Sequence, residues 1–93
     1  DKVVIGSNVC ISQGAMLLTG DHDYTISSMP YRNAAIRIED GAWIGAKTTV
    51  CPGVTVHSNA ILTVGSVATK DMETNGIYQG NPAVKIRERK IKK

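Results

Sequence analysis

An aliphatic residue recurs every six positions along most of this chain, and this repeat constrains the fold more than any other feature. The count runs over residues 5–17, pauses, and resumes over residues 38–68. All nine positions at this phase, here called anchors, are aliphatic: Ile5, Ile11, Leu17, Ile38, Ile44, Val50, Val56, Leu62 and Ala68. An amphipathic helix needs apolar residues three and four positions apart, and a half-buried strand needs them two apart. The period of six fits neither, which indicates a repeat architecture.

Two other phases of the six-residue unit are restricted as well. Three residues after an anchor, all positions but one hold Gly or Asn, and they are Asn8, Gly14, Gly20, Gly41, Lys47, Gly53, Asn59 and Gly65. Gly and Asn tolerate positive φ, so we expect a turn at the same phase of each unit. Four residues after an anchor, every side chain is small or β-branched except Asp21, which stands in the interrupted unit. The pattern predicts a short strand followed by a turn in every unit.

We therefore predict an all-β solenoid in residues 1–71, in which three units form one triangular coil. The anchors would stack inward from coil to coil, because a single unit cannot bury its own apolar face, and we expect about three coils. Phe is absent and aromatic residues make up only 4% of the chain, which favours a narrow aliphatic interior. Past Asp71 the period is lost, and residues 72–93 are predicted to form a covering segment over the last coil and a basic tail.

One large interruption separates the two stretches of the repeat. The 21-residue step from Leu17 to Ile38 inserts a polar loop, residues 23–35, that must leave the solenoid and return in phase. Loops that leave a rigid scaffold often carry function. The first coil also lacks a cap, so we expect that an N-terminal portion is missing or that an oligomer covers this end.

Charge and cysteine content exclude several classes of protein. Cys10 and Cys51 form no CxxC pair and the charged start of the chain does not resemble a signal peptide, so we expect reduced thiols in the cytoplasm. No apolar run approaches the roughly 18 residues that a transmembrane span needs. The net charge is +3, and six of the eleven basic residues crowd into the last nine positions. Such a tail suits nucleic acid, an anionic membrane surface or a phosphorylated ligand, or it is a solvated terminus.

The two histidines are the candidate proton acceptors. His22 lies at the mouth of the inserted loop between Asp21 and Asp23, and imidazole can take a proton near neutral pH. The two aspartates could orient the ring or favour its charged form, although a loop histidine between acids is often incidental. His57 follows the anchor Val56 at an outward-facing phase, so we interpret it as a surface residue. A metal site is not expected, because adjacent residues in a tight turn rarely converge on one ion.

Other motifs add little by themselves. The chain has no GxSxG motif, no cysteine close in sequence to a histidine, and no Gly-rich phosphate loop of the P-loop or dinucleotide type. The run Val64-Gly65-Ser66 is weak as a motif, because Gly65 already has a turn role. Trp43 directly precedes an anchor, where an indole either packs between subunits or forms one wall of a ligand site.

Several ordered runs of the sequence carry a resemblance. The units 5–10 (IGSNVC) and 44–49 (IGAKTT) resemble the signature of the hexapeptide-repeat transferases, whose fold is a left-handed parallel β-helix assembled as a trimer. The runs 17–24 (LLTGDHDY), 38–46 (IEDGAWIGA) and 80–83 (GNPA) are similar to the colanic-acid-type exopolysaccharide O-acetyltransferases. These are relatives of the galactoside, maltose and nodulation acetyltransferases. The resemblance covers nearly the whole chain and is more specific for the superfamily than for the subgroup.

The resemblance implies a set of site residues. His22 falls at the catalytic histidine of the family, and acetyl-CoA is implied as co-substrate, bound in a cleft between neighbouring subunits of a homotrimer. The positions that match cofactor-binding residues are Trp43, Ala46, Val64, Gly65, Ser66, Thr69, Lys70 and Arg87. Asp21, Asp23 and Tyr24 are assigned to the acceptor, a small-molecule or lipid-linked saccharide. No metal, no nucleic-acid partner and no transmembrane segment are expected.

The chain also departs from its relatives at two places. Many relatives have Ser after Trp-Ile-Gly where this chain has Ala46, so only a backbone N–H could stabilise an oxyanion there. Some relatives carry an arginine where this chain has Val84, which leaves Lys85 and Arg87 as substitutes. With Lys70, Arg87 would meet the CoA phosphates, a role that suits fixed positive charge.

The function expected from the resemblance is O-acetylation of a sugar hydroxyl in exopolysaccharide biosynthesis. Transfer would be direct: His22 takes the proton of the acceptor hydroxyl as its oxygen attacks the thioester carbonyl, and then protonates the leaving thiolate. Two alternatives stay open, namely a non-catalytic structural β-helix and an N-acetyltransferase acting on an amino sugar. A β-helix of the carbonic anhydrase type needs three histidine ligands for its metal and is disfavoured, because the chain has only two histidines.

Overall fold

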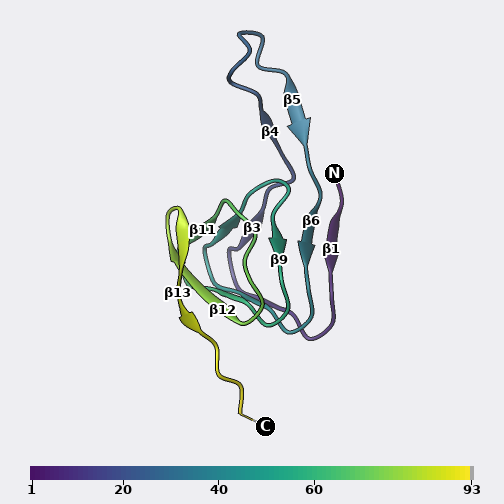
Figure 1. Cartoon of the computed structure of the whole chain (residues 1–93). Helices are drawn as coiled ribbons and strands as arrows, with labels where there is room; N and C mark the ends of the chain where they lie inside the picture. The colour runs from purple at the N-terminus through teal and green to yellow at the C-terminus, as the bar shows by residue number, and fades with distance from the viewer. Residues whose placement is uncertain (93) are drawn as a thin grey trace.

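Short strands account for the regular structure of the chain. The computed structural model describes residues 1–92, and within this range it contains thirteen strands and no helix (Figure 1). None of these residues forms a helix long and apolar enough to cross a membrane. The strands are β1 (Val3–Ile5), β2 (Cys10–Ile11), β3 (Met16–Leu17), β4 (Gly20–His22), β5 (Tyr31–Asn33), β6 (Ile36–Ile38), β7 (Trp43–Ile44), β8 (Thr49–Val50), β9 (Thr55–Val56), β10 (Ile61–Leu62), β11 (Val67–Ala68), β12 (Gly76–Gly80) and β13 (Ala83–Glu88).

Nine of these strands form the three parallel sides of a triangular prism. The strand orders are β1–β6–β9, β2–β7–β10 and β3–β8–β11, so strands that follow one another in sequence enter different sheets (Figure 1). In the second and third coils, paired residues are 18 positions apart, and Ile38 lies beside Val56. Eighteen residues are three units of six. The prediction of an all-β solenoid built from triangular coils is confirmed.

The interior of the prism is lined by the anchors. From Ile38 onward every anchor is at most 1% exposed. The residues four positions after an anchor are buried beside them: Ala42, Thr48, Val54, Ala60 and Ser66. In the first coil, Ile5 and Ile11 expose 47% and 38% of their surface, because nothing within residues 1–92 packs beneath that coil. Burial of aliphatic surface, at about 25 cal/mol per Å², therefore stabilises mainly the second and third coils.

The turns follow the predicted phase. Seven positions three residues after an anchor adopt positive φ: Asn8, Gly14, Gly41, Lys47, Gly53, Asn59 and Gly65. Lys47, the one residue there that is neither Gly nor Asn, has a φ of 55°. A β-carbon makes this left-handed region costly by about 1–2 kcal/mol per residue. Gly20 does not turn, because it begins strand β4, where the chain leaves the coil.

The interruption in the repeat is an antiparallel hairpin that projects sideways from the prism, along the direction of the strands (Figure 1). Strands β4 and β5 pair with Gly20 beside Asn33 and His22 beside Tyr31. The hairpin spans residues 20–33, so it overlaps the predicted loop 23–35 and also contains His22. A backbone hydrogen bond from Ala34 to the carbonyl of Thr19 closes its base. The chain thus returns in register for the second coil.

The repeat resumes in residues 72–80, which the count by six did not predict. Met72 is fully buried and pairs in parallel with Val56, and Asn75, three residues later, has a φ of 61°. Strand β12 then adds to β10 in parallel register. The six-residue count does break at Asp71, because the step from Ala68 to Met72 is four residues, but the parallel pairing of the coils continues past that break.

Strand β13 folds back antiparallel on β12 at the outer edge of the sheet that contains β2, β7 and β10. The chain that follows β13 extends away from the prism on the side opposite the hairpin (Figure 1). The two projections make the molecule elongated, with extents of 52 × 24 × 22 Å.

Candidate functional site

His22 is exposed on strand β4, and one backbone contact defines how its ring is used. Its Nδ1 lies 2.9 Å from the carbonyl oxygen of Met29. A carbonyl can only accept a hydrogen bond, so Nδ1 carries the proton in this contact. In the neutral ring, Nε2 then holds the lone pair and is free to accept a proton. This is the tautomer that a general base acting through Nε2 requires.

The turn of the hairpin holds the partner of His22 in place. Met29 has a φ of 46°, uncommon for a residue with a β-carbon, and it precedes Pro30. Its N–H donates to the carbonyl of Ile26 at 2.8 Å. The Tyr31 ring lies edge-on to the imidazole, with ring centroids 5.5 Å apart. Backbone held in a sparsely populated region is often found at functional sites.

Gly20 makes room for the Tyr31 ring beside His22. A β-carbon built on Gly20 would lie 1.8 Å from the hydroxyl oxygen of Tyr31. The absence of a side chain at Gly20 therefore allows the tyrosine to lie across β4. Although Gly20 matches the turn phase in the sequence, its role in the structure is this close approach.

The two aspartates that flank His22 form hydrogen bonds with other partners. Both carboxylate oxygens of Asp21 accept from Arg32, at 2.9 and 3.0 Å. Asp23 accepts from the hydroxyl and the backbone N–H of Thr25, and these two hydrogen bonds lower the pKa of Asp23. Asp21 precedes His22 on β4, and neighbouring residues of a strand point to opposite faces, which turns Asp21 away from the imidazole. The expectation that they orient the ring is corrected: the Met29 carbonyl does so.

A second feature is an apolar groove on the outer side of strands β7 and β10. Its volume is about 280 Å³, and its lining residues are Ser12, Trp43, Gly45, Ala46, Ile61, Leu62, Thr63 and Val64. Three of the predicted cofactor residues, Trp43, Ala46 and Val64, therefore line one groove. Trp43 and Val64 are 47% and 71% exposed. Neither His22 nor any other residue of the hairpin lines this groove, so one chain by itself does not bring the two features together.

The other predicted cofactor residues lie around this groove or beyond it. Gly65 forms the turn after Val64, with a φ of 72°. Ser66 is buried, and its hydroxyl accepts from the backbone N–H of Gly80 and bonds to the hydroxyl of Thr63, both at 3.0 Å. The Ser66 hydroxyl therefore forms its hydrogen bonds within the protein and is not free to bind a ligand.

The residues predicted to lie near the CoA phosphates are exposed on the last coil of the prism and on the strand that covers it. Thr69 and Lys70 follow strand β11, and Arg87 lies on β13. Lys85 is different, because its Nζ pairs with Glu73 at 2.9 Å and with Glu88. Hydrogen bonds from Lys85 to Glu88 and then to Glu73 raise the pKa of the lysine.

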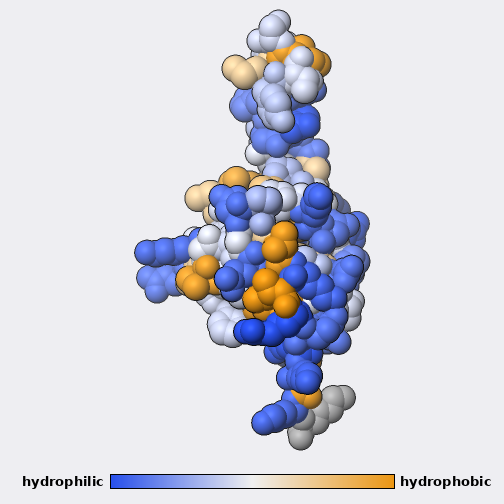
Figure 2. Space-filling model, turned by 60° about the vertical axis from the view of Figure 1, so that its left-hand side comes forward, coloured by the Kyte–Doolittle hydropathy of each residue, from blue (hydrophilic) through white to orange (hydrophobic). Residues whose placement is uncertain are grey.

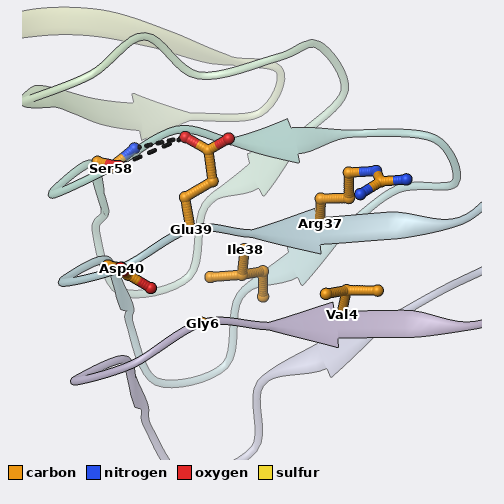
Figure 3. Close-up of a pocket in the computed structure, with 7 residues that line it drawn as sticks. All are labelled: Val4, Gly6, Arg37, Ile38, Glu39, Asp40 and Ser58. Atoms are coloured by element: carbon orange, nitrogen blue, oxygen red, sulfur yellow. Dashed lines mark hydrogen bonds between the residues drawn. The ribbon is translucent and has the colours of Figure 1, made fainter.

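A second hollow lies on another side of the prism, and none of the predicted site residues lines it. It has a volume of about 390 Å³ on the sheet of β1, β6 and β9. Figure 3 shows Arg37 standing outward from β6 and Glu39, the residue after the last of β6, directed to Ser58. His57 also contacts Glu39, with its Nδ1 at 3.1 Å from the carboxylate, and the histidine side chain is 41% exposed. Across residues 1–92, no three His, Cys, Asp or Glu side chains are grouped to hold a metal ion.

Sequence reasoning missed two groups that matter for this geometry. The Met29 carbonyl is a backbone group, so no residue type in the sequence indicates its role, although the Met-Pro pair does mark a turn. Ser12 accepts a hydrogen bond from Trp43 Nε1 at 2.8 Å across two coils, and only the stacking of the coils reveals this contact.

Three parallel sheets, a six-residue period and one hairpin with a histidine define a hexapeptide-repeat β-helix protein. No protein-family model matches the chain. Among curated proteins, it is 34% identical to the putative colanic acid biosynthesis acetyltransferase WcaF of Escherichia coli, over 95% of this chain and 48% of that protein. It is 36% identical to the galactoside O-acetyltransferase of Escherichia coli, over 92% of this chain and 44% of that protein. The chain thus spans about half the length of the curated relatives it matches.

Solved structures agree with these relatives. A galactoside acetyltransferase in complex with coenzyme A superposes with a TM-score of 0.86 at 32% identity, covering 92% of this chain and 44% of that one. A hexapeptide-repeat acetyltransferase of Vibrio cholerae, complexed with acetyl-CoA, has a TM-score of 0.78 at 21% identity, covering 96% and 61% of the two chains, and shows the shared fold. The protein belongs to the hexapeptide-repeat acetyltransferase family and has its left-handed parallel β-helix.

Proposed function

We propose that this protein is an acetyl-CoA-dependent O-acetyltransferase that acts on a sugar hydroxyl, with His22 as general base. The observation that carries the proposal is the 2.9 Å contact between His22 Nδ1 and the Met29 carbonyl, which in the neutral ring places the proton on Nδ1 and the lone pair on Nε2. The similarity to a galactoside O-acetyltransferase supports a hydroxyl acceptor on a sugar. The similarity to a putative colanic acid biosynthesis acetyltransferase supports a place in exopolysaccharide biosynthesis.

The proposed reaction needs one proton carrier and no covalent enzyme intermediate. Nε2 of His22 removes the proton of the acceptor hydroxyl while the oxygen attacks the thioester carbonyl carbon. The tetrahedral intermediate then collapses, the C–S bond breaks, and the thiolate takes the proton from Nε2. The products are the acetyl ester and CoA with a free thiol. Such assistance contributes roughly 10² to 10⁴ in rate.

We place the pantetheine arm of acetyl-CoA in the apolar groove that Trp43, Ala46 and Val64 line. Within the described residues, the backbone N–H groups of Ala46 and Val64 donate to no protein atom. Both N–H groups are therefore available to donate a hydrogen bond to the thioester oxygen or to the amide groups of the arm. They could replace the serine hydroxyl that many relatives have where this chain has Ala46. Gly65 would contribute its carbonyl, because its N–H already donates to the Ala46 carbonyl. Ser66 would only shape the turn, because its hydroxyl, N–H and carbonyl are all hydrogen-bonded within the protein.

The phosphates of CoA would meet Lys70 and Arg87, with Thr69 beside them. Lys85 is a weaker candidate than the sequence implied, because two glutamates already pair with its ammonium group. Asp21, Asp23 and Tyr24 would face the acceptor, and Tyr24 is 82% exposed on the hairpin.

A homotrimer would complete the site in this proposal. The groove contains no hairpin residue, so His22 of one subunit would act on acetyl-CoA held in the groove of its neighbour. The apolar side chains exposed on the hairpin, Tyr24, Ile26, Met29 and Tyr31, would then pack against that neighbour. The cytoplasmic setting stays a prediction, in keeping with the free thiols of Cys10 and Cys51.

The test replaces His22 by Asn and by Ala and measures release of the CoA thiol with a panel of sugar acceptors. Asparagine can place its amide nitrogen near the position of Nδ1 and so keep the bond to Met29, but it cannot act as a base. Both variants should lose about 10² to 10⁴ in kcat while still binding CoA by calorimetry. His57→Asn is the matched control and should retain turnover. Equal turnover of His22→Asn and the wild type would refute the proposal, and failure of the wild type to bind CoA would favour a structural β-helix.

A further inference from the structure

Trp43 is the one tryptophan of the chain, and it stands on the outer side of β7 with 47% of its surface exposed. An indole so exposed has little packing to hold its ring in one orientation. Its Nε1–H donates a hydrogen bond of 2.8 Å to the hydroxyl oxygen of Ser12. This is the one polar side-chain contact of the indole within residues 1–92.

Ser12 is itself held rigidly relative to the strand that carries Trp43. The N–H of Ser12 donates to the carbonyl of Ile44 at 2.8 Å, and Ile44 is the residue after Trp43. Cys10 and Ile11 pair in parallel with Trp43 and Ile44. The hydroxyl acceptor and the indole donor are thus attached to two backbones that are locked in register.

The contact lies in the wall of the groove proposed for acetyl-CoA. Ser12 and Trp43 both line this groove, together with Gly45 and residues 61–64 of the next coil. Without the hydrogen bond, rotation about χ1 and χ2 could swing the indole over the groove or away from it. Binding would then include the conformational-entropy cost of ordering the ring.

We infer that Ser12 is a positioning residue, which holds the Trp43 indole upright as a preformed wall for acetyl-CoA. The inference rests on the proposed function of the groove. The hydroxyl oxygen of Ser12 contributes to the binding of the co-substrate and not to the chemical step, because it accepts the Trp43 Nε1–H and lies in a groove that contains no residue of the His22 hairpin. Ser12 acts only through the orientation of the indole.

The experiment compares Ser12→Thr with Ser12→Val, two variants of nearly equal shape of which only the first has a hydroxyl. Ser12→Val should raise the KM for acetyl-CoA about fivefold, the value of one ordinary hydrogen bond, with kcat changed less than twofold. Ser12→Thr should stay close to the wild type. Ser7→Ala, in the same coil, is the matched control, because the Ser7 hydroxyl is not part of the groove. Equal KM values for the Thr and Val variants would overturn the inference.

A second readout is independent of activity. Trp43 can be excited selectively, so its iodide quenching and emission maximum report on this one side chain. In Ser12→Val the indole should become more accessible to iodide, and in Ser12→Thr it should not. If CoA binds to neither variant nor to the wild type, the proposed function fails but the quenching comparison still decides whether Ser12 orients the ring. Identical quenching in both variants would overturn the inference.

A third variant separates the contact from general damage to the first coil. In a Trp43→Phe background there is no Nε1–H, so Ser12→Val should add no further change to the KM for acetyl-CoA. A fivefold effect that persists in this background would show that Ser12 acts by another route and would overturn the inference.

Discussion

The second and third coils of the prism and the hairpin of residues 20–33 are stabilised in different ways. In the coils, every anchor from Ile38 to Ala68 is at most 1% exposed, and each strand pairs with a neighbour 18 residues away. In the hairpin, Tyr24, Ile26 and Met29 are 82%, 49% and 55% exposed, and Figure 2 shows apolar surface at its tip. A two-stranded hairpin alone is only marginally stable in water.

The comparison assigns stability to the coils and the proposed catalytic residue to the hairpin. The coils provide a mainly aliphatic core in which no Asp, Glu, His, Lys or Arg of the described residues is buried, and they hold the groove on their outer face. The hairpin has no core, but its hydrogen bonds orient His22, Asp21 and Asp23 individually. In the proposed trimer a neighbouring subunit would bury the tip of the hairpin, so His22, already oriented by its own hairpin, would be held next to the groove of that neighbour.

The largest expected effect contrasts one isoleucine from each region. Ile44→Ala removes a fully buried anchor and should lower the free energy of unfolding by about 2–5 kcal/mol. Ile26→Ala, at the hairpin tip, should change it by less than about 0.5 kcal/mol in a dilute monomer. Urea unfolding followed by circular dichroism measures both. A large effect of Ile26→Ala that depends on protein concentration would show that the hairpin is buried in an assembly; equal effects at all concentrations would contradict the comparison.

A smaller effect is expected at the turns of the coils, where backbone strain can be changed without touching the core. Lys47 has a φ of 55°, so Lys47→Gly should raise the free energy of unfolding by up to about 1 kcal/mol. Gly65→Ala should lower it by about 1 kcal/mol, although a β-carbon there would meet no atom within 4 Å. Thermal unfolding of both variants measures the direction in which each substitution changes the free energy of unfolding. Shifts of the same sign would show that φ does not decide stability at these positions.

The smallest expected effect concerns the turn of the hairpin at low pH. The Thr25 hydroxyl and backbone N–H lower the pKa of Asp23, so the carboxylate stabilises the turn above its ordinary pKa of about 3.9. This contribution should be lost only as the pH falls through the lowered pKa of the folded protein. An NMR titration of the Asp23 carboxyl carbon measures it. In Thr25→Val, which lacks the hydroxyl, the pKa should move up toward its ordinary value; an unchanged titration would contradict this account.

The fold could be predicted from particular residues because the repeat is one-dimensional. Each anchor contacts mainly the anchors of adjacent coils, so the burial of Ile38, Ile44 and Val50 could be predicted from their spacing alone. Met72 was missed because a four-residue step breaks the count, even though its side chain takes the place of an anchor. The phase of a repeat can be read from sequence only while the loops between strands keep one length.

The candidate site could be predicted only in part. The sequence and its resemblance placed His22 in the one interruption of the repeat and drew attention to Trp43, Ala46 and Val64, which line one groove. They assigned the orientation of His22 to its aspartate neighbours, whereas Asp21 bonds to Arg32, eleven residues away. Adjacent residues of a strand face opposite sides, so nearness in sequence was a poor guide to contact there.

The sequence by itself determined the period, the inward phase of the anchors and the left-handed turns, because burial and positive φ are demands that act within each six-residue unit. Only the tertiary structure decided which ring nitrogen of His22 is free and that Ser12 supports Trp43 across 31 residues. Hydrogen bonds depend on distances of a few tenths of an ångström and on the direction of each donor. Those are set by how a hairpin turns and how coils stack, and they leave no period in the sequence.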